Sequence, residues 1–421
     1  MNTNNRKDYF WNTVGVFAQN AISPLLLIVV TRINGVYDSG IFSYALATAL
    51  IFWAFGVWGG RTYQVSDLRR EFANHSYVMV RVLLGVVTLL GSVLFCMANG
   101  YDLVKTSIII AFVVFKTFES IADAIYGVLQ VGNKLFITGR SLLIKSVLGL
   151  IVFITVDAIS KNLLWSVFTL VFVNVAVFIY YDLHYARRLD YHLSDIIGEL
   201  SRYTREAITI IKRCMPIAAV LFLSMFSLNI PRYFLDRYHP DEIGYFGILV
   251  MPITVLALVI TFLLQPKIIY LSELFIKQKY DDFNHAIRNI VSVVVCVGLA
   301  GLVLAYLIGI PVLNTIFGLD FTPYLAALLI VVLGSIANGI VSIYMNIFTI
   351  IRHFKALFYT LVLTNVSLLF LSTVIVDKYN LQGAIGLFAA INFLQACILV
   401  GAYWVLIKKY MNDSVGSRKS Q

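Results

Sequence analysis

The chain has 421 residues, of which 60% are hydrophobic and only 13% are charged. Soluble domains carry about 25% charged residues, so no soluble core could bury this much apolar surface and a soluble protein is excluded. The net charge of +10 leaves two explanations, a surface for nucleic acid or the cytoplasmic side of a membrane.

The apolar residues gather into long stretches, the first of which follows a short polar N-terminus. A stretch of about 18 residues or more can cross the hydrocarbon core of a bilayer. This first stretch is too long for a cleavable signal and lacks a clear cleavage site, so we predict a retained membrane span. About twelve spans are predicted, at approximately 12–31, 41–60, 79–98, 106–130, 141–159, 162–182, 214–235, 243–266, 289–310, 323–350, 356–376 and 383–407.

The Lys and Arg residues divide unequally between the two sides of the predicted membrane. The N-terminus, every second loop and the C-terminus together hold 25 of the 32, the opposite loops hold 6, and Lys116 lies inside a span. Positive charge marks cytoplasmic loops, so both termini are predicted in the cytoplasm and the protein in the cytoplasmic (inner) membrane. The distribution of Lys and Arg thus indicates how the chain is oriented in the membrane, and a nucleic-acid partner is not expected.

The longest loop divides the predicted spans into two halves of six. We predict an N-terminal bundle over 1–190, a cytoplasmic amphipathic linker over 191–213 and a C-terminal bundle over 214–421. The halves resemble each other: TRINGVYDSGIFSYALA follows the first span and PRYFLDRYHPDEIGYFGILV follows the seventh. In both, an Arg ends the helix and an acidic turn precedes Gly and aromatic residues. Weak internal repeats of this kind are typical of transporters.

The residues that usually perform catalysis or hold cofactors show no functional pattern. The four cysteines lie far apart in apolar runs, and the six histidines lack the spacing of metal ligands. A membrane glycan polymerase or transferase would need carboxylates on a sizeable outer loop, but the predicted outer loops have about a dozen residues or fewer. We therefore predict neither an enzyme nor a bound cofactor or metal.

The predicted fourth span carries charge within the membrane, where it is costly and marks either a path or an ion pair. Its polar residues recur at steps of three or four, so they share one helix face, which we expect to point to the bundle interior. They are Lys116, Glu119, Ser120, Asp123, Gly127 and Gln130. The alternative is that Lys116 only pairs with its neighbours and closes the helix packing.

Other polar residues in and beside the spans are weaker candidates. The tenth span has an uncharged stripe of Ser335, Asn338, Ser342 and Asn346, and the first contains Gln19 and Asn20, which could equally join helices. Cations end corresponding spans of the two halves. Arg32 and Arg232 lie on the outer side, and Arg61 and Lys267 on the inner side. Snorkelling to lipid head groups is the alternative explanation.

These motifs, together with IYGVLQVGNK, IFGLDFTPYLAALLIV and YNLQGAIGLFAAINFLQ, resemble the Wzx-type flippases of O-antigen and polysaccharide repeat units. Those flippases belong to the multidrug, oligosaccharidyl-lipid and polysaccharide exporter superfamily. The resemblance implies an all-α membrane protein of two six-helix bundles around a cationic central cavity. It also implies an undecaprenyl-diphosphate-linked oligosaccharide as substrate, moved by alternating access. Membrane lipids, a glycan polymerase and chain-length machinery would be the partners.

This resemblance, together with the chemistry of a diphosphate, assigns expected roles to the residues above. Arg32, Arg61, Lys116, Arg232 and Lys267 would bind the diphosphate, because charge-assisted hydrogen bonds are strong where water is scarce. The amides and hydroxyls would bind sugars, and Glu119 and Asp123 would couple transport to an ion gradient. A cation-coupled multidrug or toxic-compound antiporter remains the alternative, and an excess of buried carboxylates over cations would favour it.

Overall fold

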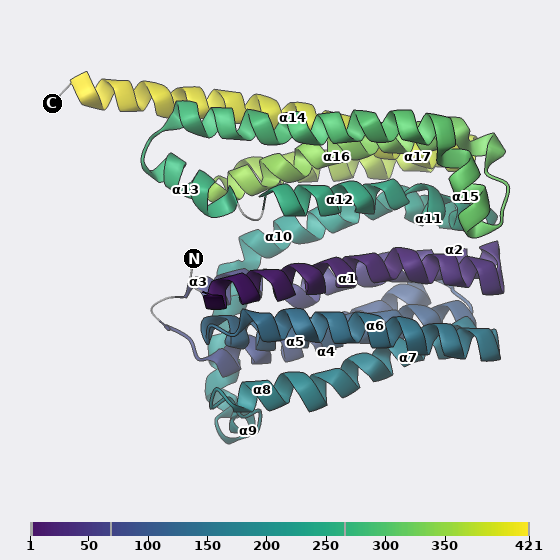
Figure 1. Cartoon of the computed structure of the whole chain (residues 1–421), viewed down its shortest axis with the longest axis horizontal. Helices are drawn as coiled ribbons and strands as arrows, with labels where there is room; N and C mark the ends of the chain where they lie inside the picture. The colour runs from purple at the N-terminus through teal and green to yellow at the C-terminus, as the bar shows by residue number, and fades with distance from the viewer. Residues whose placement is uncertain (1–2, 68–69, 265–266, 420–421) are drawn as a thin grey trace. The chain divides into compact units, whose positions relative to one another are not determined.

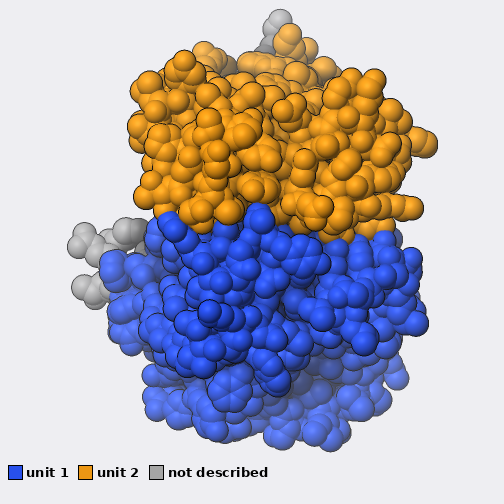
Figure 2. Space-filling model, turned by 90° about the vertical axis from the view of Figure 1, so that its right-hand side faces the viewer, with its two compact units in different colours: residues 1–225 blue, residues 226–421 orange. Residues whose placement is uncertain are grey.

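The structure is a computed structural model that describes residues 3–67, 70–264 and 267–419. Throughout these ranges the chain forms helices joined by short turns, and no strand occurs in them (Figure 1). The chain divides into two compact units, Met1–Met225 and Phe226–Gln421, which Figure 2 colours separately. We call them the N-terminal and C-terminal units and describe each by itself.

The N-terminal unit contains helices α1 to α9, the π-helix η1 and the first part of α10. Helix α10 begins in this unit and ends in the next, because the boundary at Met225 falls inside it. The helices are α1 Thr3–Asn34, α2 Val36–Val57, α3 Gly60–Ser66, α4 Asn74–Asn99, α5 Leu103–Val131, α6 Leu135–Ser160, α7 Leu163–Val177, the π-helix η1 Phe178–Asp182, α8 Leu183–Arg187, α9 Asp195–Gly198 and α10 Leu200–Tyr238.

The C-terminal unit continues from α10 with the same long-helix design. Its helices are η2 Pro240–Glu242, α11 Ile243–Leu249, α12 Met251–Leu264, α13 Ile268–Ile276, α14 Tyr280–Leu304, the π-helix η4 Ala305–Gly309, α15 Ile310–Phe317, η5 Thr322–Tyr324, α16 Leu325–Ile350 and α17 Phe354–Lys419.

The predicted spans coincide with helical segments where the structure describes them, although some run across consecutive elements, as the eighth does across α11 and α12. Gln265 and Pro266 at the end of the eighth lie outside the described residues. Ten helical stretches within the described ranges are long and apolar enough to cross a membrane. Helix α5 is not one of the ten, because any 18 consecutive residues of it include three charged ones. Helix α17 counts once but holds two predicted spans, separated at Asn380, whose φ of 50° and ψ of −135° interrupt the helix. The protein is therefore an all-α, multi-pass membrane protein.

The two units pair their helices in the same way, as the internal repeat predicts. In the N-terminal unit α5, the fourth predicted span, packs against α2, α4 and α7. In the C-terminal unit α16, the tenth, packs against the corresponding helices α12, α14 and α17. In both halves the helix with the polar stripe thus packs against spans two and three of its own bundle, and it also packs against span six in the N-terminal unit and against α17, which holds spans five and six, in the C-terminal unit.

Helices α1 and α6 lie side by side in the N-terminal unit and approach most closely at two glycines (Figure 1). A Cβ atom on Gly15 would overlap the backbone of Gly139, and one on Gly139 would overlap the backbone around Trp11. Backbone atoms cannot move aside as a flexible side chain can. Small residues at such crossings are the usual way for membrane helices to approach.

We expect Gly139→Ala to destabilise the protein by about 1–3 kcal/mol or more, because the helices must separate to admit one methyl group. Thermal unfolding of the purified protein in detergent measures the effect. Gly301→Ala is the matched control, since a Cβ there meets no atom within 4 Å and alanine favours a helix. Equal melting temperatures for the two variants would contradict the close crossing.

The segment predicted as a linker, 191–213, contains α9 and the first third of α10. One apolar face of it packs inside the N-terminal unit. Tyr203, Ala207, Ile210 and Cys214 form a buried cluster with residues of α4. The charged side chains remain outside, as in the ion pair of Arg202 with Glu206. Protein therefore covers one apolar face of the segment, while Ile197, Leu200 and Ile208 remain exposed.

Candidate functional site

Asp123 on α5 is shared by two arginines from two other helices. Its Oδ1 accepts from Nη1 of Arg61 at 3.2 Å, and its Oδ2 accepts from Nη2 of Arg81 at 3.1 Å. Arg61 also donates to Oε1 of Gln130, which lies two turns further along the same face of α5. Two guanidinium groups and one carboxylate give this cluster, which we call the Asp123 cluster, a net charge of +1.

A break between α2 and α3 places Arg61 at this cluster. Trp58 and Gly59 adopt left-handed conformations with φ of 45° and 68°, and α3 begins at Gly60. The indole Nε1 of Trp58 donates to the carbonyl of Ile211 at 2.8 Å, which stabilises the unusual conformation of a bulky residue. Arg61 therefore lies in the first turn of a new helix instead of continuing along α2.

A second ion pair lies two turns nearer the start of α5. The Lys116 ammonium contacts Oε2 of Glu119 at 2.6 Å, and the Gln19 amide on α1 donates to Oε1 of Glu119 at 3.3 Å. All three side chains are at least partly buried. The stripe predicted on α5 therefore points into its own bundle, and Lys116 makes the local pair that the alternative explanation expected.

A third ion pair is buried beside α5. Lys145 on α6 contacts Oδ2 of Asp182 at 2.7 Å and donates to the Tyr126 hydroxyl at 2.9 Å. Ser141 Oγ lies 3.0 Å from the same hydroxyl. Asp182 belongs to the π-helix η1 and has no exposed surface. A buried pair of this kind is stable only when both charges remain together.

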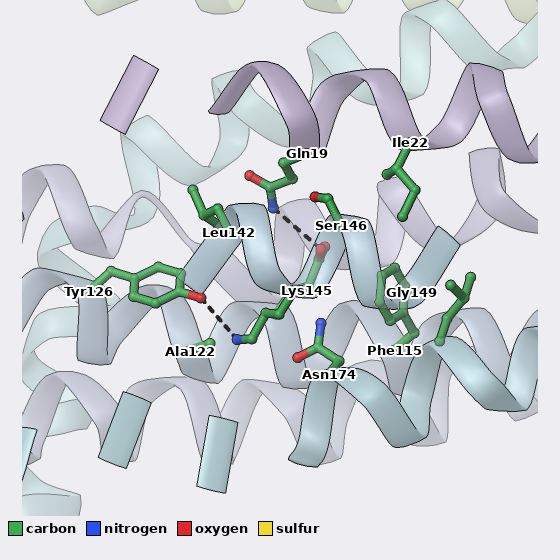
Figure 3. Close-up of a pocket in the computed structure, with 12 residues that line it drawn as sticks. Gln19, Ile22, Phe115, Ala122, Tyr126, Leu142, Lys145, Ser146, Gly149 and Asn174 are labelled. Atoms are coloured by element: carbon green, nitrogen blue, oxygen red, sulfur yellow. Dashed lines mark hydrogen bonds between the residues drawn. The ribbon is translucent and has the colours of Figure 1, made fainter. Parts of the chain in front are cut away.

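A small cavity in the N-terminal unit is lined by one residue of each of two ion pairs, Glu119 of the Lys116 pair and Lys145 of the Asp182 pair. Side chains of α1, α5, α6 and α7 line it, among them Gln19, Glu119, Lys145 and Asn174. Figure 3 shows the Tyr126 hydroxyl and the Lys145 ammonium directed at each other, with the Asn174 amide pointing into the same space. Its volume of about 30 Å³ admits one or two water molecules but no sugar.

The other predicted cations take no part in these three ion pairs. Arg32 is exposed in the last turn of α1, and Lys267 is exposed immediately before α13. Arg232 on α10 places its guanidinium 5.3 Å from the ring centre of Phe246 and contacts Asn229 at 3.5 Å. Arg232 and Lys267 belong to the C-terminal unit, whereas Arg32, Arg61 and Lys116 belong to the N-terminal unit.

Among the uncharged polar residues, three donate side-chain hydrogen bonds to backbone carbonyls of their own helix. Ser335 is buried and its hydroxyl donates to the carbonyl of Val331, while Asn346 donates to the carbonyl of Ser342. Asn338 and Ser342 are half-buried on the same helix, α16. On α1, Asn20 is exposed and donates to the carbonyl of Val16.

Two charged residues of the site were assigned differently from the sequence. The 25 cations that the sequence places on the cytoplasmic side include Arg81 and Lys145. Arg81, however, is buried in α4 and bound to Asp123, and its position inside the apolar run YVMVRVLLGVV is the signal for this in the sequence. Lys145 is paired with Asp182, which falls at the end of a predicted span, and no spacing rule connects the two.

Comparison with known proteins agrees with this architecture. No family model matches the chain. The "Capsular polysaccharide biosynthesis protein CapF" of Staphylococcus aureus is 24% identical over 406 residues, covering 94% of this chain and 91% of that protein. Solved structures that resemble the chain include a transporter and a flippase.

Two solved structures match nearly the whole chain. The lipid II flippase MurJ, in an inward closed conformation, has a TM-score of 0.68 at 14% identity and covers 96% of this chain and 90% of its own. An inward-facing multidrug resistance MATE family transporter of the MOP superfamily has a TM-score of 0.67 at 12% identity, with 93% and 96% covered. The chain therefore has the fold that these two transporters share, which confirms the all-α membrane architecture predicted from its sequence.

Proposed function

We propose that this protein is a flippase that moves an undecaprenyl-diphosphate-linked oligosaccharide, an O-antigen or capsule repeat unit, from the cytoplasmic to the outer leaflet by alternating access. The observation that carries the proposal is the Asp123 cluster, an excess positive charge inside a membrane bundle with one partly exposed arginine. The name of the Staphylococcus aureus relative, a capsular polysaccharide biosynthesis protein, supports the same class of substrate.

The chemistry of a diphosphate fits the side chains of this site. A guanidinium donates two parallel hydrogen bonds to phosphate oxygens, which an ammonium cannot do. Arg61 is therefore the principal diphosphate ligand of the proposal, with Lys116, Arg32, Arg232 and Lys267 as further cations along the path. The hydroxyls and amides, Gln19, Asn20, Ser335, Asn338, Ser342 and Asn346, would bind sugar hydroxyls.

The proposed direction of transport follows from the charge of the loops. Removing Arg81 and Lys145 from the predicted cytoplasmic count leaves 23 Lys and Arg there against 6 in the opposite loops. That asymmetry still favours cytoplasmic termini in the inner membrane. A membrane potential that is positive outside would then favour outward movement of two negative charges by about 4.6 kcal/mol per 100 mV.

Ion coupling by Glu119 and Asp123 belongs to the same proposal. Both carboxylates already form ion pairs within the chain. Glu119 pairs with Lys116, and Asp123 pairs with Arg61 and Arg81. A proton or sodium ion taken up by either carboxylate would weaken these pairs and free a cation. Coupling would therefore act by changing the positive charge available to the substrate.

A cation-coupled multidrug antiporter is the second candidate, because Asp157 is a buried carboxylate without a Lys or Arg partner among the described residues. Its Oδ1 accepts from the Asn34 amide at 3.0 Å and the Ser166 hydroxyl at 2.7 Å, and its Oδ2 has no hydrogen-bond partner there. A transporter of organic cations favours such a group. The intramembrane cations elsewhere in the same unit do not favour it.

Purified protein in vesicles that contain a fluorescent lipid-linked oligosaccharide tests the proposal. Without transport, a membrane-impermeant reagent that oxidises sugars reaches only the outer half of the labelled lipid. We expect the protein to expose the inner half as well, and to expose it faster when the membrane potential is set to favour anion movement. Persistent protection of the inner half, with efflux of a cationic dye from the same vesicles, would instead establish the antiporter.

A further inference from the structure

We propose that Arg81 is a positioning residue, which neutralises Asp123 so that Arg61 can leave that carboxylate and bind the diphosphate of the substrate. The inference rests on the proposed function and deepens it by assigning a role to a residue that does not itself touch the substrate. It follows from the contacts, burial and charge of the Asp123 cluster.

The two arginines use different atoms of the same carboxylate. Arg61 contacts Oδ1 and Arg81 contacts Oδ2, at 3.2 and 3.1 Å. Neither arginine blocks the other, so departure of Arg61 leaves the contact of Arg81 intact. A carboxylate with two oxygens can accept from two guanidinium groups at once.

Arg81 is buried much more completely than Arg61. The Arg81 side chain is 1% exposed, whereas that of Arg61 is 27% exposed. Arg81 also donates to the carbonyl of Gly56 at 3.2 Å, and a Cβ on Gly60 would lie only 3.1 Å from its terminal nitrogens. The guanidinium of Arg81 therefore lies flat against glycine backbone, in a space that a larger residue would fill.

The remaining contacts of Arg61 can be given up without leaving a charge behind. Apart from Asp123 its hydrogen-bond acceptor is Gln130, a neutral amide that is itself half-buried. A phosphate offers Arg61 a charged acceptor in exchange, and charge-assisted hydrogen bonds are roughly twice as strong as neutral ones.

The charge balance gives Arg81 its role. With Arg81 present, the departure of Arg61 leaves a neutral pair of Arg81 and Asp123. Without Arg81, the same departure would leave an isolated carboxylate within the membrane, where an unpaired charge is strongly unfavourable. Because Arg81 stays with Asp123, Arg61 is free to leave the carboxylate and bind the diphosphate.

Binding of undecaprenyl diphosphate to the purified full-length protein in lipid nanodiscs tests this role. We expect Arg81→Met to weaken binding about tenfold or more, because Arg61 is then the sole counter-ion of Asp123. Adding Asp123→Asn should restore binding to near the wild-type value. Asp123→Asn alone should bind as tightly as the wild type or more tightly, since it frees both arginines.

The Asp123→Asn variant keeps the proposal falsifiable if Arg81→Met fails to fold. A purely structural role for the cluster predicts that Asp123→Asn weakens binding or leaves only its melting temperature changed, with no restoration in the double variant. Weaker binding by Asp123→Asn, or unchanged binding by folded Arg81→Met, would overturn the inference. Wild-type protein that does not bind undecaprenyl diphosphate at all would contradict the proposed function itself.

Discussion

Replacing Lys145 by methionine is expected to destabilise the N-terminal unit by about 3–5 kcal/mol. The ammonium contacts Asp182 at 2.7 Å, and Asp182 has no exposed surface. Methionine fills a similar volume, so the variant creates little cavity and mainly leaves a carboxylate without its counter-ion. Breaking a buried pair is costly for this reason, whereas removing both charges is often tolerated.

The double variant Lys145→Met with Asp182→Asn separates charge from shape. We expect it to recover most of the lost stability in thermal unfolding of the detergent-solubilised protein. Lys277→Met is the matched control, because Lys277 makes a similar pair with Glu273 at 3.1 Å in which both side chains are more than half exposed. That change should cost less than about 1 kcal/mol. Equal losses for Lys145→Met and Lys277→Met would contradict a buried pair at Lys145.

The helix face that carries charge could be predicted from sequence because helical spacing alone determines it. Lys116, Glu119 and Asp123 lie one turn apart, and all three make their ion pairs inside the N-terminal unit. The local pair of Lys116 with Glu119 follows from the same spacing, but the partners of Asp123 do not. Arg81 lies 42 residues from Asp123, and no local rule connects two helices that meet only after folding.

Span positions were likewise predictable, but the interruptions within helices were not. Hydropathy places a span wherever about 18 apolar residues follow one another. It does not detect that Trp58 adopts a left-handed conformation, because a bulky residue with φ of 45° is rare and depends on the tertiary contact with Ile211. Arg61 reaches Asp123 through this break. The functional geometry therefore depends on the feature that sequence periodicity describes least well.

Replacing Arg61 by alanine is expected to reduce transport about 10- to 100-fold without unfolding the protein. Hydrogen bonds to charged groups contribute about 1.5–3 kcal/mol each, which sets the size of the loss. Folding should survive because Asp123 retains its contact with Arg81 at 3.1 Å. The rate at which lipid-linked oligosaccharide becomes accessible in vesicles measures the effect, and melting temperature reports the folding.

Two further variants test whether the loss of transport comes from the two parallel hydrogen bonds that the Arg61 guanidinium can donate. Arg61→Lys keeps the positive charge but cannot donate two parallel hydrogen bonds, so its rate should fall between those of the wild type and Arg61→Ala. Arg188→Ala removes the same charge from an exposed position beside Tyr185 and should transport normally. If Arg188→Ala lost as much activity as Arg61→Ala, general surface charge would explain transport better than the Asp123 cluster. If Arg61→Lys matched the wild type, the diphosphate would be held by charge alone, and the geometry of the fork would have no role.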